Sequence, residues 1–530
     1  MRPVFLMATA MALSVAPATN VRADAATVAT PARLAIHAAR MLDVESGRMV
    51  ADPLVLVEGD RIVSVTAGGS APAGAQLVEL GDATLLPGLI DVHVHLTGDP
   101  TVSTGNYYQD ALTQGPMDSA VMAPTFAKRT LDAGFTTVRN VGADEYIDVA
   151  LRNAINRGLV TGPRMLVATV PIGATGGHVD ETTGFAPNIE FRGVTGVANG
   201  VDAVRERVRE NVKHGADVIK FMASAGVLSN ETSVGAPQYS QAEMDAIVDE
   251  AHRWGKKVAA HAHGTEAIKM AIRAGVDSVE HCSFIDDEGL KLAKQHGTYL
   301  DFDIYNDDYI LTEYAKLGVP QAQIDKEKLV GRVQRENSRK AVQAGEKMAF
   351  ATDAGVYPHG WNAKQFAKEV QWGMTPLQAI RSATTDAADL LGWKDQVGAL
   401  KPGYYADMIA VSGDPLADVS VLEHVGFVMK GGRVIRGAQQ PLARPGRGDR
   451  AAGHCPSRSA PAPPAQAAGV AGHDRDLRVP GVGIRLGTWA TGPARLHDRT
   501  AALVAAMRRP APGCRRRHPY RLAAQRRRQA

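Results

Sequence analysis

The stretch that decides the fold of this chain is Leu86-Pro87-Gly88-Leu89-Ile90-Asp91-Val92-His93-Val94-His95-Leu96. It is an apolar run that leads into two histidines one residue apart. In a β-strand, residues i and i+2 face the same side, so the side chains of His93 and His95 can reach one metal ion. A His-x-His pair alone is a weak signal in a chain with 16 histidines. Its interpretation therefore depends on candidate ligands elsewhere in the sequence.

The composition is that of a globular protein, but charge is divided unevenly along the 530 residues. Hydrophobic residues make up 45% and charged residues 22%, as in ordinary soluble domains. Residues 441–530 contain 18 Arg, no Lys, four Asp and no Glu, a net charge of +14, whereas the whole chain carries +3. Residues 1–440 therefore carry −11, and an acidic body gives no indication of nucleic-acid binding. Of three cysteines only Cys282 lies in that body, which excludes a disulfide framework and a Cys-rich zinc site.

The N-terminus has the pattern of a secretory signal peptide, which we predict over residues 1–25. Arg2 gives a positive start, an apolar run extends from Val4 to Val15, and Ala23-Asp24-Ala25 supplies small residues for cleavage. The run is too short to cross a bilayer, and the sequence shows no other candidate membrane span. We therefore predict a periplasmic or secreted protein, and the alternative is a disordered or mistranslated leader.

Both ends of the chain body are rich in short strand-like runs. These runs are 34–38, 55–57, 61–65, 405–411 and 426–435. Two β-rich ends that flank one large middle predict a small composite β-sandwich domain, formed by residues 26–90 and 395–437.

Between these ends, strand-like and helix-like runs alternate. One strand carries His93, and the other strand-like runs are 136–141, 164–168, 218–221, 258–261, 278–281, 299–302 and 348–353. Helix-like runs lie between most of them, for example 202–213, 241–254 and 266–274. A β/α repeat of roughly 250–300 residues is typical of a (β/α)8 barrel. We therefore predict an α/β protein with a TIM barrel over residues 91–394.

The last segment, 438–530, differs in kind from the rest. It is a mixture of Ala, Arg, Pro and Gly without sustained periodicity, which is typical of a disordered basic arm. GC-rich DNA read out of frame gives the same bias, so a frameshift-derived segment is the interpretation we prefer. In either case the tail contributes nothing to the predicted fold.

Candidate ligands fall at the ends of the predicted strands, where a barrel builds its active site. Each has an ordinary alternative: a single strand-end His is usually a core or surface residue, a strand-end Lys is usually solvated, and an Asp before Ala-Gly often makes a turn. An ordered set that converges on one barrel mouth is harder to explain in this way. The set is His93, His95, Lys220, His261, His281 and Asp353.

The chain resembles the metal-dependent amidohydrolase superfamily over about residues 33–437. The stretch 86–95 matches the family's first-strand motif, and Lys401-Pro402-Gly403-Tyr404-Tyr405-Ala406-Asp407 is typical of its closing segment. The resemblance implies two divalent metal ions, in the first place zinc, bridged by a carboxylated Lys220. It implies that the first metal is held by His93, His95 and Asp353, and the second by His261 and His281.

The chemistry of these side chains agrees with that implied assignment. A lysine ammonium is a poor metal ligand, but a carbamate on Lys220 is an anion with two oxygens that can bridge two cations. Imidazole and carboxylate suit zinc, and a metal-bound water has its pKa lowered to about 7. Asp353 can then take the proton of the attacking water and pass it to a leaving amine.

Three further stretches resemble the prolidase-like Xaa-Arg/Xaa-Pro dipeptidase group, which includes ochratoxin-hydrolysing amidohydrolases. They are Gly173-Ala174-Thr175-Gly176-Gly177-His178, Ala260-His261-Ala262-His263-Gly264 and Tyr357-Pro358-His359-Gly360. This resemblance implies that His178 contacts the substrate or its oxyanion and that Tyr239 meets the substrate carboxylate. His263 faces the same side as His261, so it is either a substrate contact or the metal ligand in place of His261.

The predicted function is hydrolysis of amide bonds in dipeptides or N-acyl amino acids, ochratoxin-like amides included. The alternatives are a cyclic-amide hydrolase or deaminase on the same scaffold and an inactive binding scaffold, which the complete ligand set disfavours. The partner is a small molecule or dipeptide, and homo-oligomerisation stays open, as does the metal's identity. Asp303, Asp307 and Asp308 indicate either a preference for a basic substrate side chain or a solvated loop.

Overall fold

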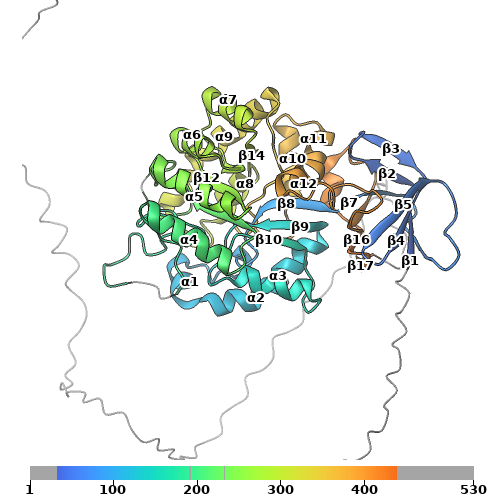
Figure 1. Ribbon diagram of the computed structural model, residues 1–530, viewed down its shortest axis with the longest axis horizontal. Coiled ribbons are helices and arrows are strands. Elements are labelled where there is room, and N and C mark those ends of the chain that lie inside the picture. Colours follow the sequence, from blue (N-terminus) through green and yellow to red (C-terminus); the bar gives the residue numbers. More distant parts are fainter. Residues whose placement is uncertain (1–32, 190–192, 232, 438–530) are drawn as a thin grey trace, which may run out of the picture. The chain divides into compact units, whose positions relative to one another are not determined.

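The computed structural model describes residues 33–189, 193–231 and 233–437 (Figure 1). The predicted signal peptide at 1–25 and the predicted tail at 438–530 lie outside the described residues, so both stay predictions. Within the described part of the chain, no helix is both long and apolar enough to cross a membrane.

Strand-like runs predicted at both ends of the body are strands in the structure, with bounds that differ by a few residues. These strands are β1 Arg33–His37, β2 Arg40–Asp43, β3 Arg48–Ala51, β4 Pro53–Glu58, β5 Arg61–Ala67, β6 Gln76–Glu79, β7 Ala83–Pro87, β15 Met408–Ser412, β16 Phe427–Lys430 and β17 Arg433–Arg436. A six-stranded sheet of order β17-β16-β15-β7-β2-β3 joins the two ends, because β15 pairs antiparallel with β7. A four-stranded sheet of order β5-β4-β1-β6 shares a buried core with it, in which Ile36 and Val55 join Met408 and Phe427.

The middle of the chain forms two parallel sheets, of order β10-β9-β8 and β11-β12-β13-β14 (Figure 1). Their strands are β8 Leu89–Val94, β9 Phe135–Asn140, β10 Arg164–Val167, β11 Val218–Met222, β12 Lys257–Ala262, β13 Ser278–His281 and β14 Tyr299–Asp301. Every residue of β8, β9, β11 and β13 is buried. Continuous burial is expected of parallel strands that are covered on both faces.

Helices follow most of these strands, as the alternating pattern predicts. They are α1 Tyr107–Thr113, α2 Pro116–Asp132, α3 Ile147–Asn156, α4 Val201–Lys213, α5 Gln241–Arg253, α6 Thr265–Ala274, α7 Asp287–His296, α8 Asn306–Glu313, α9 Gln321–Ala344, α10 Lys364–Gln371, α11 Pro376–Arg381 and α12 Ala387–Leu391. Local signals set their ends. Ser240 caps α5 in a capping box with Glu243, and Gly275 ends α6 with a φ of +94°, a conformation that favours glycine.

The predicted strand at 348–353 is wrong as a regular strand, because the structure assigns no strand there. The segment does bond to β8, whose Val92 N–H donates to the Phe350 carbonyl at 2.9 Å. Phe350 directs its own N–H to the Ser382 carbonyl at 3.0 Å rather than to a neighbouring strand. Asp353 has a φ of +55°, which leaves the extended region, so the ladder is interrupted beside a predicted ligand.

Backbone hydrogen bonds also connect the two parallel sheets. Ile172, which follows β10, donates to the Lys220 carbonyl at 2.9 Å and accepts from the Met222 N–H at 2.8 Å, both in β11. On the other side, Leu300 of β14 donates to the Lys347 carbonyl at 2.9 Å. The segment that starts at Lys347 therefore lies between β14 and β8, and the strand ends that carry the predicted ligands face one region.

Candidate metal centre

β8 places His93 and His95 beside Asp353. Nε2 of His93 lies 3.3 Å from Asp353 Oδ1, and Nε2 of His95 lies 3.2 Å from the same oxygen. The Asp353 N–H donates to the His93 carbonyl at 2.8 Å, which ties the irregular segment to the strand. The three side chains each offer one ligand atom within 4.8 Å of the others, a spacing that one metal ion can span.

A second group consists of His261 and His263 from β12 and its end, with His281 from the end of β13. Their ligand atoms also lie within 4.8 Å of one another. The ring centroids of His261 and His281 are 4.5 Å apart, and those of His263 and His281 are 4.7 Å apart. The structure therefore brings both His261 and His263 close to His281. Which of the two binds the second metal stays a prediction.

Most of these imidazoles have their Nδ1 atoms held by an oxygen, which leaves Nε2 for another partner. The pairs are His93 with Glu280 at 2.8 Å, His95 with the Gly142 carbonyl at 3.3 Å, His263 with Ser283 at 2.8 Å and His281 with Asp303 at 2.9 Å. A partner on one ring nitrogen fixes the tautomer and the ring orientation. This is the arrangement that metal-ligating histidines require.

His261 provides an observation that tests whether a metal fits. Its Nε2 atom is buried and has no hydrogen-bond partner among the described residues, although its side chain stands among other imidazoles. Buried polar atoms are normally satisfied, and a metal ion held between these imidazoles would give His261 Nε2 a partner. Imidazole nitrogens and a carboxylate are the donor set that suits zinc, and the residues present therefore fit a metal.

Lys220 lies in β11, where it is paired with Ala259 of β12 and is only 1% exposed. Burial lowers the pKa of its amine below the usual range, and Glu280 and Asp353 act in the opposite direction. The neighbouring strand β12 carries His261, and β13, the next strand in the sheet, carries His281. The structure thus places Lys220 on the strand next to one histidine group, and its role as a bridging ligand stays a prediction.

His178 lies against this centre. Its ring stacks on that of His261 with centroids 4.2 Å apart, and its Nδ1 is 2.9 Å from the Ser229 hydroxyl. Burial, then His281 and Lys220, lower the pKa of His178 to about 3, so the ring is neutral near pH 7. Lys326 of α9 donates to the carbonyls of Gly226 and Ser229, at 2.8 and 2.7 Å, and so fixes the loop that holds His178.

The structure does not join Tyr239 to the histidines. Tyr239 is buried, and its hydroxyl donates to the Ala198 carbonyl at 2.8 Å. Its predicted contact with a substrate carboxylate stays a prediction, and this hydroxyl would have to leave a hydrogen bond to make it.

The acidic stretch after β14 matches neither arrangement that the sequence indicates, a solvated loop or a set of carboxylates that favours a basic substrate. Asp303 is buried and accepts from His281, so it belongs to the metal centre and not to a solvated loop. Asp307 and Asp308 are ion-paired with Arg335 at 2.8 and 3.1 Å. Carboxylates that are already paired give no support to a basic-substrate preference.

Glu280 is the residue of the centre that the sequence reasoning missed most clearly. It is fully buried, bonded to His93, and paired with Arg139 at 2.8 Å. The available signal is a pair of opposite charges inside buried strands, one in Ser278-Val279-Glu280-His281 and one in Thr136-Thr137-Val138-Arg139. Charged groups are rarely buried unless they are paired.

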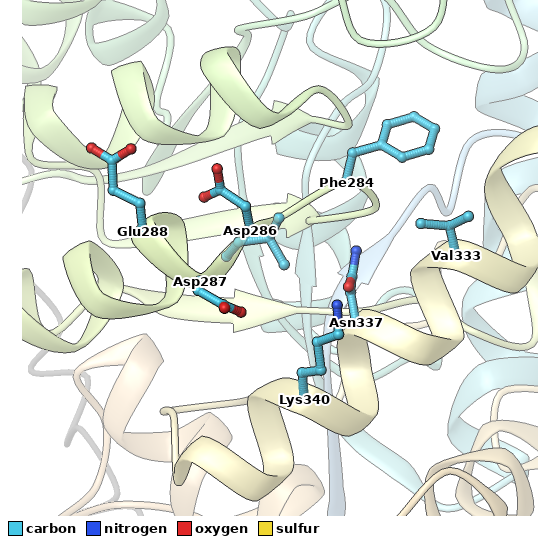
Figure 2. Close-up of a pocket in the computed structure, with 8 residues that line it drawn as sticks. Phe284, Asp286, Asp287, Glu288, Val333, Asn337 and Lys340 are labelled. Atoms are coloured by element: carbon cyan, nitrogen blue, oxygen red, sulfur yellow. The ribbon is translucent and has the colours of Figure 1, made fainter.

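A surface pocket lies next to the centre but is not part of it. Figure 2 shows that it is lined by residues before and at the start of α7, among them Phe284 and Asp286, and by α9 residues such as Asn337 and Lys340. None of the predicted ligands lines it. Asn337 donates to the Ser283 carbonyl at 2.8 Å, so this side of α9 supports the segment that carries Ser283.

The sequence profile of the Amidohydrolase family matches residues 84–435. The chain belongs to the amidohydrolase family. Among the relatives of this amidohydrolase is ochratoxinase of Aspergillus niger, which is 35% identical over 381 residues that cover 67% of this chain and 76% of the relative. These matches establish that the protein is a hydrolase.

Solved structures of prolidase-like enzymes are similar to this amidohydrolase. A Xaa-Pro dipeptidase with methionine bound in its active site matches with a TM-score of 0.73 and 38% identity over 77% of this chain and 100% of that chain. A prolidase in complex with N-methylphosphonate-L-proline matches with a TM-score of 0.70 and 32% identity over 76% and 99%. The resemblance predicted from the sequence is therefore confirmed for both branches, prolidase-like and ochratoxinase.

Proposed function

We propose that this amidohydrolase is a binuclear metal-dependent enzyme that hydrolyses the amide bond of dipeptides or N-acyl amino acids, ochratoxin-like amides included. The observation that carries the proposal is the pair of ligand groups, His93/His95/Asp353 beside the end of β8 and His261/His263/His281 at the ends of β12 and β13. Both named relatives reported above, ochratoxinase and the Xaa-Pro dipeptidase, support amide hydrolysis.

We further propose that the two parallel sheets are halves of one (β/α)8 barrel. The backbone bonds of Ile172 and of the segment from Lys347 support this, because they join the outer edges of the two sheets on both sides. The two sheets that are built from the ends of the chain body, in one of which β15 lies beside β7, would then form the composite β-sandwich domain. In such barrels the active site lies at the C-terminal ends of the strands, which is where the histidines stand.

The ligands of the proposed centre follow from the two groups. His93, His95 and Asp353 would hold one ion, His281 with His261 would hold the other, and carboxylated Lys220 would bridge them. When bound, two divalent cations polarise a carbonyl and lower the pKa of a coordinated water to about 7. The remaining steps depend on what the protein's own side chains do.

Asp353 is the proposed proton carrier. Its Oδ1 is directed at both His93 and His95, and its Oδ2 accepts from the Asn306 amide at 3.3 Å. As a carboxylate it can accept the proton of the attacking water and then donate it to the leaving amine nitrogen. Asp353 thus holds the proton between attack of the water on the carbonyl carbon and cleavage of the amide C–N bond.

His178 is the proposed partner of the carbonyl oxygen. A neutral imidazole can donate from Nε2 only when Nδ1 accepts, so the Ser229 hydroxyl must direct its hydrogen to Nδ1 rather than to the Gly226 carbonyl at 3.3 Å. In that tautomer Nε2–H is free to stabilise negative charge that develops on the carbonyl oxygen. His263 and Tyr239 stay candidate substrate contacts.

The test is a substrate screen with metal control. The purified protein is freed of metal with a chelator, reloaded with Zn²⁺, and incubated with N-acyl amino acids, dipeptides, ochratoxin-like amides and cyclic amides. We expect hydrolysis of linear amides with a free C-terminal carboxylate only after reloading. Hydrolysis of cyclic amides alone would favour the alternative function, and turnover without metal would contradict the proposal.

We also propose that the protein is exported, on the pattern of residues 1–25. N-terminal sequencing of the mature protein tests this, and cleavage near Ala23 or Ala25 is the expected result. A mature chain that starts at Met1 in the cytoplasm would contradict it.

A further inference from the structure

Glu280 connects a proposed metal ligand to a buried arginine. Its Oε2 lies 2.8 Å from His93 Nδ1, and its Oε1 accepts from Arg139 Nη2 at 2.8 Å and from the Ser278 hydroxyl at 2.5 Å. The exposed fractions are 0% for Glu280, 1% for His93 and 2% for Arg139. Because the three side chains are buried from bulk solvent, these contacts set their orientation.

The two carboxylate oxygens of Glu280 bind different partners, Oε2 the His93 ring and Oε1 the Arg139 guanidinium. A carboxylate can only accept, so His93 must carry its proton on Nδ1 and must present the lone pair of Nε2. That Nε2 is the atom directed at Asp353 Oδ1, 3.3 Å away. Glu280 therefore selects the tautomer of His93 that can bind a cation and aims its ring at the ligand group.

Arg139 keeps the Glu280 charge buried at low cost. Its guanidinium donates to the Val92 carbonyl next to His93 at 2.5 Å, and its Nη2 also reaches Asp301 Oδ2 at 3.1 Å. A buried carboxylate without a paired cation would be strongly destabilising. Because Arg139 touches the backbone of β8 and the side chain from β13, it also sets the distance between the two partners.

We propose that Glu280, held by Arg139, is a positioning residue for His93, so that it raises metal affinity by orienting the imidazole and fixing its tautomer. The proposal rests on the proposed function, because it requires His93 to bind a metal. Carboxylates that accept from the second nitrogen of a ligating histidine typically contribute 10–100-fold to metal affinity. A purely structural ion network would contribute to folding but not to metal affinity.

Asp301 offers a matched control for Glu280. Both carboxyl groups are fully buried and pair with the same nitrogen of Arg139, but of the two only Glu280 is hydrogen-bonded to His93. Glu280→Gln and Asp301→Asn therefore each replace one carboxyl group next to Arg139 with an amide of similar size. His93 faces Oε2 of Glu280 and Arg139 faces Oε1, and a glutamine in the same orientation presents its NH2 group, which cannot accept, at one of these two positions.

The experiment measures Zn²⁺ affinity of the full-length apo enzymes by competition with a chromophoric chelator, together with their unfolding temperatures without metal. We expect Glu280→Gln to bind one of the two zinc ions about 10–100-fold more weakly. Asp301→Asn should bind it within about threefold of the wild type. The visible spectrum of the Co²⁺-loaded enzymes should change for Glu280→Gln and not for Asp301→Asn.

Equal losses of affinity in the two variants, or an unchanged affinity in Glu280→Gln, would overturn the proposal. If Glu280→Gln does not fold, Glu280→Asp decides, because it keeps the charge next to Arg139 and withdraws it from His93 by one methylene. Wild-type affinity in Glu280→Asp would then overturn the proposal. Failure of the proposed function is seen separately, in a wild-type enzyme that binds no stoichiometric zinc.

Discussion

The imidazole of His178 lies almost parallel to that of His261, with ring centroids 4.2 Å and planes 25° apart. Gly226 supports this arrangement, because a Cβ at that position would meet three atoms of the His178 ring at 2.3–2.8 Å. The backbone of one loop therefore determines where a proposed carbonyl-binding side chain stands relative to a proposed metal ligand.

The first prediction concerns the role of His178. His178→Ala should lower turnover by about 10²–10³-fold, the loss expected for a donor to the oxyanion. Gly226→Ala should act in the same direction, because the added methyl displaces the ring without removing it. The measurement is kcat and KM for the best amide substrate, with metal content determined in parallel.

Gly98→Ala is the control for His178→Ala and Gly226→Ala, because a Cβ at Gly98 meets nothing within 4 Å. It should leave kcat and KM near the wild-type values. A higher KM with unchanged kcat in His178→Ala would assign His178 to substrate binding instead.

The second prediction concerns Asp353. Asp353→Asn can still coordinate through its oxygen but cannot accept a proton, so turnover should fall by about 10²–10⁴-fold. Because weaker metal binding would mimic this loss, metal occupancy is measured by elemental analysis on the same samples. A metal-replete Asp353→Asn enzyme with near-normal turnover would rule out the proposed proton carrier.

The third prediction concerns Lys220. Lys220→Ala should lose metal and activity, because it removes the bridging carbamate. A short-chain carboxylic acid should restore part of the activity by taking the place of that carbamate. Metal content and turnover with and without the acid are the measurements, and full metal content in Lys220→Ala would count against the bridge.

Much of the fold was predictable from local sequence, because buried parallel strands read as continuous apolar runs. The histidines after those runs were predictable for the same reason, since a strand end is a position that sequence alone can mark. The segment 348–353 was not, because its irregularity depends on where the N–H of Phe350 finds an acceptor, in Ser382. Tertiary contacts, and not the local sequence, determine which carbonyl accepts this N–H.

The oxygens that orient the histidines were also beyond sequence reasoning. Glu280 lies 187 residues from His93 along the chain, and Asp303 lies 22 residues from His281. Asp303 in particular looked like one of three equivalent surface acids, because its neighbours Asp307 and Asp308 have the same local pattern. Only the packing of α9 and β14 separates their roles.

The fourth prediction is a pH dependence of stability. Glu250 of α5 accepts from Arg209 and Arg205 of α4, and these contacts, Arg209 first, lower its pKa from 4.5 to about 2. A lowered carboxylate pKa stabilises the fold fully above the unfolded value of about 4.5 and progressively less as the pH falls toward 2. Glu250→Gln should therefore destabilise at pH 7, by about 1–3 kcal/mol for a charge-assisted hydrogen bond.

The difference in unfolding temperature between Glu250→Gln and wild type should shrink between pH 4.5 and the lowest pH at which both still fold. Asp245, on the same helix and bonded to Gln241 rather than to an arginine, gives the control Asp245→Asn. A difference for Glu250→Gln that stays constant with pH would contradict the assignment.

The fifth prediction concerns the tail. The last strand, β17, ends at Arg436, so a chain that ends at Gln440 should fold and turn over normally. A chain that ends at Lys430 removes β17 from its pairing with β16 and should unfold at a lower temperature. A large loss of stability in the longer of the two chains would show that residues beyond 440 belong to the fold.

The central claim is tested most directly by titrating the apo enzyme with Zn²⁺ in the presence of ¹³C-bicarbonate. Hydrolysis of the best amide substrate and the ¹³C signal of a carbamate are followed together. We expect activity to reach its maximum at two zinc ions per chain and a carbamate signal to appear in wild type but not in Lys220→Ala. Full activity at one zinc ion per chain, with an unmodified Lys220 amine, would contradict it.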